Sequence, residues 1–272
     1  IKALVWGVVQ RAELFLIGWA SHGLVVTTGK RAQILRRGFP WKRNCIRRIP
    51  VGPNILRVWR ASQRVAVRAA IGATDDTAVL GVFSTLNQHR SLIMVVQAVA
   101  MLSAKRDVRL LCLGKIDRSH RVWKEAMGLT ARLGVDSLIH APGVQPPQDL
   151  SASFGALDVF LALYEDGASG ARGTLMAALA HGLPVISTRG AATDADWFVE
   201  EENVLFLESP DPAALAELIL RILQDSQLRE RLREGARRSY RAHFSWDVIA
   251  RGQLDLMEQV LRCRPGLRGE AG

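Results

Sequence analysis

The sequence predicts an α/β protein: a doubly wound parallel sheet with C-terminal helices and a partial first domain. Short β-branched runs alternate with stretches of helical periodicity over most of the 272 residues, a pattern typical of βαβ units. Helical periodicity then continues beyond residue 209 without another strand. With 49% apolar and 23% charged side chains, the chain can bury a sizeable core, which excludes disordered and collagen-like proteins.

Eight strands are expected, two before and six after a break near residues 51–76. The strands are predicted at residues 23–28, 46–51, 78–83, 108–114, 137–143, 157–164, 184–190 and 203–208. Helices are predicted at residues 88–104, 118–133, 147–155 and 173–182, with a basic helix at about 58–70. The six later strands can form a complete domain, whereas about 50 leading residues are too few to bury a core alone.

The last part of the chain carries helix signals only. Asp211 can cap a helix that has Pro212 at its first position, because an aspartate accepts the first free amides and a proline needs none. Helical periodicity runs from there to about Phe244, and Ser245 can cap a further helix from 246 to about 262. Two or three helices are therefore expected to close the chain.

Positive charge is concentrated at the start of the sequence. Residues 1–70 hold 14 Lys and Arg against the single acid Glu13, a net charge of +13, while the remainder holds 22 bases against 25 acids, a net charge of −3. Clustered bases near an anionic lipid surface contribute on the order of 1 kcal/mol each. Nucleic-acid motifs and interleaved aromatic residues are missing. We expect residues 1–70 to face an anionic membrane surface and no nucleic acid; an Arg-rich composition, with only six Lys among the 36 bases, is the alternative interpretation.

Cysteine, histidine and hydropathy patterns exclude several other classes. The three cysteines are widely spaced without a C-x-x-C pair, which favours a reducing compartment and argues against a zinc site. No histidine stands at metal-ligand spacing from Cys, Asp or Glu, and no Ser-His-Asp elbow is present. The longest uncharged apolar run, residues 92–102, is too short to cross a bilayer. The protein is expected in the cytoplasm, without a transmembrane segment.

Ligands of open parallel sheets bind at the carboxyl ends of the strands. Three loops there stand out: residues 81–90, residues 114–117, and the glycine-rich segment YEDGASGARG at 164–173. In the third loop, glycines permit close backbone approach, a helix N-terminus can hold a phosphate, and carboxylates can accept sugar hydroxyls. Neither a P-loop nor a G-x-G-x-x-G fingerprint is present. An ordinary glycine-rich turn is therefore the alternative interpretation.

Five segments taken together resemble a known family. They are IPVGPNI at 49–55, residues 81–90, LLCLGK at 110–115, residues 157–193 and HFSWDVIA at 243–250. Their order and spacing resemble the donor half of family-four glycosyltransferases of the GT-B fold, over about residues 20–262. The resemblance implies a Rossmann-like donor domain and retaining transfer from a UDP- or GDP-sugar to a glycan or lipid-linked acceptor. It also implies that the reaction has no obligatory metal and that the protein acts at the inner face of the membrane.

The resemblance also implies a domain organisation. Residues 1–56 would be a remnant of the acceptor-side domain, followed by a linker helix and turn at 57–76. The nucleotide-sugar donor domain would span 77–244, with a crossover helix at 245–264 and a flexible tail at 265–272.

Site residues follow from the matching motif positions. Glu165 or Asp166 would be the sugar-side acid, and Arg90 stands where the family usually has a lysine on the diphosphate. The other expected donor contacts are Gly81, Ser84, Gly114, Ser169, Gly170, Arg172, Gly173, Thr174 and Leu175. Thr174 is the candidate ribose partner.

The sequence departs from the family at its pair of glutamates eight positions apart. Counting forward from Asp166 puts Thr174 in the second place; counting back from the following helix puts Ala177 there and Ser169 in the first. Neither register supplies a second carboxylate. A non-catalytic nucleotide-sugar-binding module is therefore the alternative to an enzyme. His181 and Gly182 are expected to end the helix rather than to act in catalysis.

Overall fold

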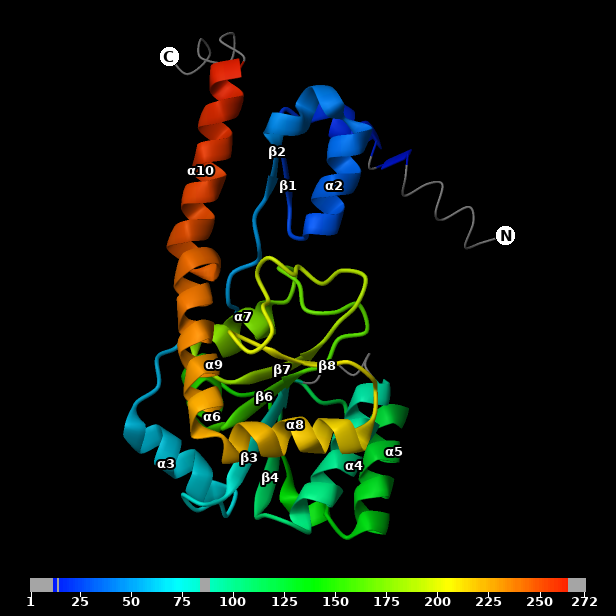
Figure 1. The fold of residues 1–272 in the computed structure, drawn as a ribbon, viewed down its shortest axis with the longest axis vertical. Coiled ribbons are helices and arrows are strands. Elements are labelled where there is room, and N and C mark those ends of the chain that lie inside the picture. Colours follow the sequence, from blue (N-terminus) through cyan, green and yellow to red (C-terminus); the bar gives the residue numbers. More distant parts are fainter. Residues whose placement is uncertain (1–11, 14, 84–88, 264–272) are drawn as a thin grey trace, which may run out of the picture.

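The structure, a computed structural model, describes residues 12, 13, 15–83 and 89–263. Within them the chain forms two parallel sheets, one of two strands and one of six, joined along one side by a long C-terminal helix (Figure 1). The predicted α/β class, the eight strands and their parallel arrangement are confirmed. The predicted unit boundaries stay predictions.

The small sheet belongs to what we call the N-terminal unit, residues 12–56. Strand β1 (Leu24–Val26) pairs with β2 (Ile46–Arg48). Helix α2 (Gly29–Gly38) and the 3₁₀-helix η1 (Pro40–Cys45) connect them. Phe39 and Ile46 are buried beneath this crossover. Both strands end toward the larger sheet, so the loops after them face its loops (Figure 1).

The large sheet has the strand order β5-β4-β3-β6-β7-β8, all parallel. Its strands are β3 (Ala78–Phe83), β4 (Val108–Leu113), β5 (Ile139–Gly143), β6 (Val159–Ala162), β7 (Val185–Thr188) and β8 (Leu205–Leu207). The order reverses between β3 and β6, which is the place where ligands bind in doubly wound sheets.

Helices cover both faces of this sheet. One face packs on α4 (His89–Ser103), α5 (Arg121–Leu133) and α8 (Pro212–Gln224). The other face packs on α6 (Pro147–Ala156) and α7 (Gly173–Ala180), with α9 (Ser226–Ser239) lying against α7. Helix α3 (Ala61–Ala70) contacts α6 and leads into β3, and the 3₁₀-helix η2 (Asp136–Leu138) precedes β5.

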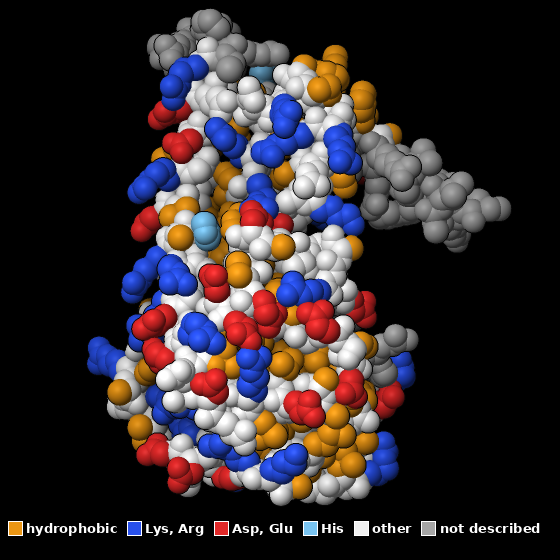
Figure 2. Space-filling view, viewed as in Figure 1, with side chains coloured by type: hydrophobic (Ala, Val, Ile, Leu, Met, Phe, Trp, Pro, Cys, Tyr) orange, Lys and Arg blue, Asp and Glu red, His pale blue; other side chains and the backbone are white. Residues whose placement is uncertain are grey.

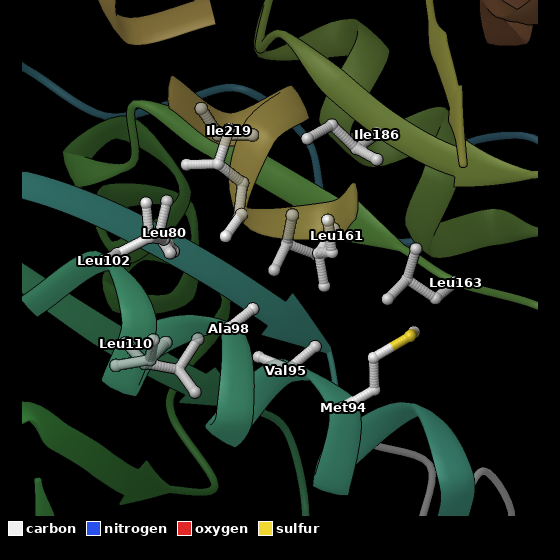
Figure 3. Close-up of a cluster of buried hydrophobic side chains, with 14 of the residues drawn as sticks. Leu80, Met94, Val95, Ala98, Leu102, Leu110, Leu161, Leu163, Ile186 and Ile219 are labelled. Atoms are coloured by element: carbon white, nitrogen blue, oxygen red, sulfur yellow. The ribbon is translucent and has the colours of Figure 1, made fainter. Parts of the chain in front are cut away.

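Close packing on the first face fixes the strands that carry the candidate site. Leu80, Leu161 and Ile186 project from β3, β6 and β7 between Val95 of α4 and Ile219 of α8 (Figure 3). All five side chains are at most 3% exposed. Each such side chain contributes roughly 1.5–3 kcal/mol of transfer free energy when buried, so the strand ends are held rigidly relative to one another.

Three α-helices close the described chain, which confirms the predicted two or three. Asp211 caps α8 as predicted, since its Oδ2 accepts from the Ala214 amide at 2.8 Å. The helix does not run on to Phe244, because it stops at Asp225, whose side chain accepts from the Leu228 amide at 2.9 Å and starts α9. An aspartate side chain competes with the helix for backbone donors and favours a cap. A π-helical turn, η3 (Tyr240–Phe244), then leads into the last helix.

The last helix, α10 (Trp246–Cys263), crosses from the large sheet to the N-terminal unit (Figure 1). The Trp246 ring lies against Gly52, while Leu256 and Val260 lie against Gly23. A Cβ at Gly52 would lie 2.6 Å from the Trp246 ring, and one at Gly23 would lie 2.9 Å from Val260 and 3.4 Å from Leu256. The helix therefore holds the N-terminal unit in place over the carboxyl edge of the large sheet. In the part of the chain that is described, no helix has both the length and the apolarity needed to cross a bilayer.

Candidate functional site

The carboxyl ends of β6, β7 and β8 border a cavity of about 690 Å³. Glu165, three residues after β6, lines it together with Thr188, the last residue of β7, and Arg189, which follows it. The first turns of α4 and α8 close its other side with Ser91 and Pro212. Glu165 is exposed and forms no ion pair among the described residues. Of the two candidate acids, it is the one whose carboxylate is not already neutralised by a cation.

Asp166, the other candidate acid, is paired. It forms an ion pair with Arg172 across the glycine-rich turn. The guanidinium of Arg172 also lies over the Tyr164 ring, 4.5 Å from its centroid. The Tyr164 hydroxyl shares a 3.1 Å hydrogen bond with Thr174 Oγ1, and burial raises the pKa of Tyr164. Asp166, Arg172, Tyr164 and Thr174 thus form one connected group at the edge of the turn.

Helix α7 begins at Gly173 with its first amides unoccupied. Arg172 is its N-cap residue and supplies no side-chain cap. The amides of Gly173, Thr174 and Leu175 therefore lack an acceptor within the helix, and they carry the positive end of its dipole. Ser169 precedes this turn, fully buried, and its Oγ has no hydrogen-bond partner in the described structure. Buried polar atoms are normally satisfied, so these donors form a site suited to an anion.

The Gly170 amide, a predicted diphosphate contact, has another partner. It donates to Asp194 Oδ2 at 2.9 Å in the interior. The Gly170 carbonyl accepts from the Val51 amide at 2.8 Å, so both backbone groups of this glycine are used within the fold. The Gly170 amide is therefore not free to contact a ligand in this structure.

The remaining predicted glycines differ in position. Gly81 lies buried inside β3, where an added Cβ would lie 2.3 Å from Leu157 Cδ1. Close strand-to-helix packing explains this glycine without a ligand. Gly114 lies at the carboxyl edge after β4, with a left-handed φ of +96° and the Phe83 ring beside it. Of the two, only Gly114 lies at the carboxyl edge of the sheet.

For three predicted site residues, the structure places no side chain at the site. Leu175 is buried in the core on its own face of the sheet, so its amide alone faces the turn. Ser84 lies outside the described residues. Arg90 belongs to the first turn of α4, and its side chain lies outside the description.

Helix α7 contains no carboxylate. Ala177 is fully buried in it, and the helix ends as predicted at His181 and Gly182, the latter with a φ of +68°. His181 Nε2 lies 3.0 Å from Ser151 Oγ and Nδ1 lies 2.7 Å from the Ala177 carbonyl. Burial lowers the pKa of His181 to about 4, so it is a neutral structural residue at physiological pH.

The described residues contain neither a reactive buried cysteine nor a cluster of metal ligands. Cys112 is buried in β4, and burial raises the pKa of its thiol to about 12. That pKa leaves the thiol protonated and inert. No group of three or more His, Cys, Asp or Glu side chains is arranged to hold a metal ion in the described ranges. The expected independence from metal stays a prediction.

Six parallel strands flanked by helices, facing a second parallel βαβ unit across their carboxyl edge, define the GT-B class of fold. A crystal structure of a glycosyltransferase from Rickettsia africae ESF-5 matches with a TM-score of 0.73 at 18% identity, over 88% of this chain and 63% of that one. Anabaena Alr3699/HepE in complex with UDP matches with a TM-score of 0.76 at 16% identity, over 92% and 67%.

The family model for glycosyl transferases group 1 matches residues 77–225, and the chain belongs to this family. The D-inositol 3-phosphate glycosyltransferase of Corynebacterium jeikeium (strain K411) is 25% identical over 257 residues. That alignment covers 91% of this chain and 59% of the relative. The chain therefore spans about three fifths of the length of this curated relative.

Proposed function

We propose that this chain binds the nucleotide-sugar donor of a retaining glycosyltransferase, which transfers the sugar to a glycan or lipid-linked acceptor. The observation that carries the proposal is the uncapped start of α7 beside the unpartnered Ser169 hydroxyl. Backbone donors at a helix N-terminus are a ready site for phosphate. The Anabaena neighbour in complex with UDP supports a nucleotide diphosphate as the ligand.

The geometry supports a division of roles. The amides of Gly173, Thr174 and Leu175 and the Ser169 hydroxyl hold the diphosphate, and Arg90 adds positive charge from α4. Glu165 faces the cavity and accepts hydroxyls of the sugar, while Asp166 orients Arg172 toward the phosphates. Thr174 Oγ1 is the ribose contact. Charge then develops on the leaving diphosphate, where each preorganised donor is worth about 2.7–4 kcal/mol. These groups need no metal ion.

A non-catalytic donor-binding module is the second candidate. Two observations favour it: Asp166 is already neutralised by Arg172, and the buried Ala177 stands where the second acid of the family falls in one register. Such a module would bind the nucleotide sugar without transferring or hydrolysing the sugar. Activity therefore separates the two candidates, while binding tests both together.

Binding is expected for UDP- or GDP-sugars, and Arg90→Ala is expected to weaken it at least about tenfold, equivalent to 1.4 kcal/mol. A thermal-shift screen detects it, because a ligand at 100 times its Kd stabilises by about 2.7 kcal/mol. Titration calorimetry then compares Arg90→Ala with Arg121→Ala, whose side chain is exposed on α5. An absence of binding to any nucleotide or nucleotide sugar contradicts the proposal. Binding without donor hydrolysis or transfer supports the module.

We also propose that the N-terminal unit and α3 rest on an anionic membrane surface at the cytoplasmic face. Lys and Arg spread over the N-terminal unit beside exposed hydrophobic side chains (Figure 2), and Trp19 and Trp41 are 66% and 65% exposed. Lys42 is used within the fold, since its Nζ donates to the carbonyls of Gly18 and Ser21. The exposed bases are Lys30, Arg31, Arg37, Arg43, Arg47, Arg57 and Arg60.

Co-sedimentation with liposomes tests this surface. Vesicles that contain phosphatidylserine are expected to retain the protein, and Trp41→Ala combined with Arg43→Ala is expected to weaken retention, which salt also reduces. Arg121→Ala on the large unit is the matched control. Equal retention by neutral vesicles would exclude an electrostatic surface.

A further inference from the structure

Asp194 joins the candidate site to the N-terminal unit. It follows β7 and is only 4% exposed. Its Oδ2 accepts from the Gly170 amide at 2.9 Å, and its Oδ1 accepts from the Gly29 amide at 2.7 Å. Gly170 belongs to the glycine-rich turn, whereas Gly29 is the first residue of α2. One buried carboxylate therefore fixes two backbone segments that belong to different sheets.

The backbone around Asp194 holds the carboxylate in this orientation. The Asp194 amide donates to the Ala168 carbonyl at 2.9 Å, so the loops after β6 and β7 run side by side. The Asp194 carbonyl accepts from the amides of Trp197 and Phe198 at 3.0 and 3.1 Å. These bonds fix the backbone of Asp194 beside the glycine-rich turn, so the residue cannot move away from Gly170 as a whole without breaking them.

Arg48 compensates the buried charge. Its Nη1 lies 3.3 Å from Asp194 Oδ1, and its guanidinium stacks 3.6 Å above the centroid of the Trp197 ring. Arg48 also pairs with Asp196, whose side chain is 61% exposed. Burying a carboxylate is costly unless hydrogen bonds and an opposite charge compensate it, and Asp194 has both.

We propose that Asp194 is the positioning residue of the donor site. By bonding the Gly170 amide, Asp194 fixes the position of the neighbouring Ser169 hydroxyl and of the turn that leads into α7. By bonding the Gly29 amide, it also fixes the position of this turn relative to α2. The inference rests on the proposed function. It goes beyond that function because it makes donor affinity depend on a buried carboxylate outside the glycine-rich turn, one that binds both this turn and the start of α2.

Asp194→Asn is the decisive variant. An asparagine side chain offers one acceptor oxygen and one NH₂ donor, so its NH₂ must face the amide of Gly170 or of Gly29, donor against donor. Asp196→Asn is the first control. It removes the other carboxylate charge that pairs with Arg48, and it leaves the hydrogen bonds of the Gly170 and Gly29 amides in place. Asp158→Asn is the second control. Asp158 Oδ2 likewise accepts from a backbone amide, Val79 at 2.8 Å, and from Arg68 at 3.1 Å, but it precedes β6 at the opposite edge of the sheet.

Two measurements read out the positioning role. In the free protein, Asp194→Asn is expected to speed amide hydrogen exchange in peptides that cover 168–176, where Asp158→Asn leaves exchange as in the wild type. By titration calorimetry, Asp194→Asn is expected to weaken UDP binding about tenfold or more, the equivalent of losing one charge-assisted hydrogen bond. Asp158→Asn is expected to lower Tm comparably and leave UDP affinity unchanged.

The outcomes separate the inference from the function on which it rests. If the wild-type chain fails to bind UDP and every other nucleotide, the proposed function is wrong, while the exchange rates still decide whether Asp194 positions the turn. If Asp194→Asn exchanges like the wild type across 168–176, the inference is overturned. It is also overturned if Asp158→Asn weakens UDP binding as much, because the effect would then reflect global stability.

Discussion

Replacing Arg68 by methionine is expected to lower the free energy of unfolding by about 3–5 kcal/mol, the usual cost of removing one partner from a buried ion pair. Arg68 on α3 is 3% exposed. Its guanidinium donates to the carbonyls of Thr74, Thr77 and Ala156 and to Asp158 Oδ2, at 2.5–3.1 Å. Methionine fills similar space but takes the guanidinium donor away from all four acceptors, and Asp158 keeps only the Val79 amide and the more distant Arg64.

Denaturant unfolding measures the loss. Arg64→Met is the matched control, because Arg64 lies one turn earlier on the same helix and reaches the same Asp158, at 3.6 Å, with a third of its side chain exposed. Its loss is expected to cost about 1 kcal/mol or less. Equal losses for the two variants would show that the buried carbonyls around Arg68 do not depend on its guanidinium.

Gly170→Ala is expected to weaken UDP binding about 10- to 100-fold. An added Cβ would lie 2.4 Å from the Trp197 ring and 2.5 Å from the Thr27 carbonyl oxygen. The backbone oxygen cannot rotate aside, so the turn must move away from the N-terminal unit and from Asp194. Forcing a methyl group into a packed site costs typically 1–3 kcal/mol, and tenfold in affinity corresponds to 1.4 kcal/mol.

Titration calorimetry with UDP checks this expectation against Gly128→Ala. Gly128 lies in α5, where an added Cβ has only ordinary contact with the Arg132 side chain at 3.6 Å. That variant is expected to bind UDP like the wild type and to be as stable or slightly more stable. Unchanged binding by Gly170→Ala would mean that the turn does not need its approach to Thr27.

Local patterns in the sequence predict most of the fold. The eight strands are short β-branched runs bounded by turn residues. Such runs are recognisable from residues close together in the sequence, so the strands could be predicted. The number of helices after Asp211 is predicted only as two or three, because Asp225 divides a continuous helical periodicity by a single side-chain cap. Asp225 can either continue one helix or cap the next, and hydrophobic periodicity does not distinguish the two.

The sequence predicts the glycine-rich turn and its acidic residues Glu165 and Asp166. It does not predict which residues form ion pairs and hydrogen bonds with the turn. The pairing of Asp166 with Arg172 spans six residues, whereas Asp194 meets Gly29 over a separation of 165 residues and Gly170 over 24. No local pattern marks Asp194 as the acceptor of both amides. Gly81 shows the converse: a glycine that matches a motif lies inside β3 and serves packing against Leu157.

The course of α10 has a consequence for the order of folding. The N-terminal unit is synthesised before the rest of the described chain, yet it packs against a helix about 200 residues later, with Gly23 on Val260 and Arg47 bonded to Gln259 at 2.8 Å. Closing so long a loop is entropically costly and slow. Until α10 arrives, the surface of the unit around Gly23 and Ile49 lacks the helix that covers it, so the nascent chain is most prone to aggregate during this interval.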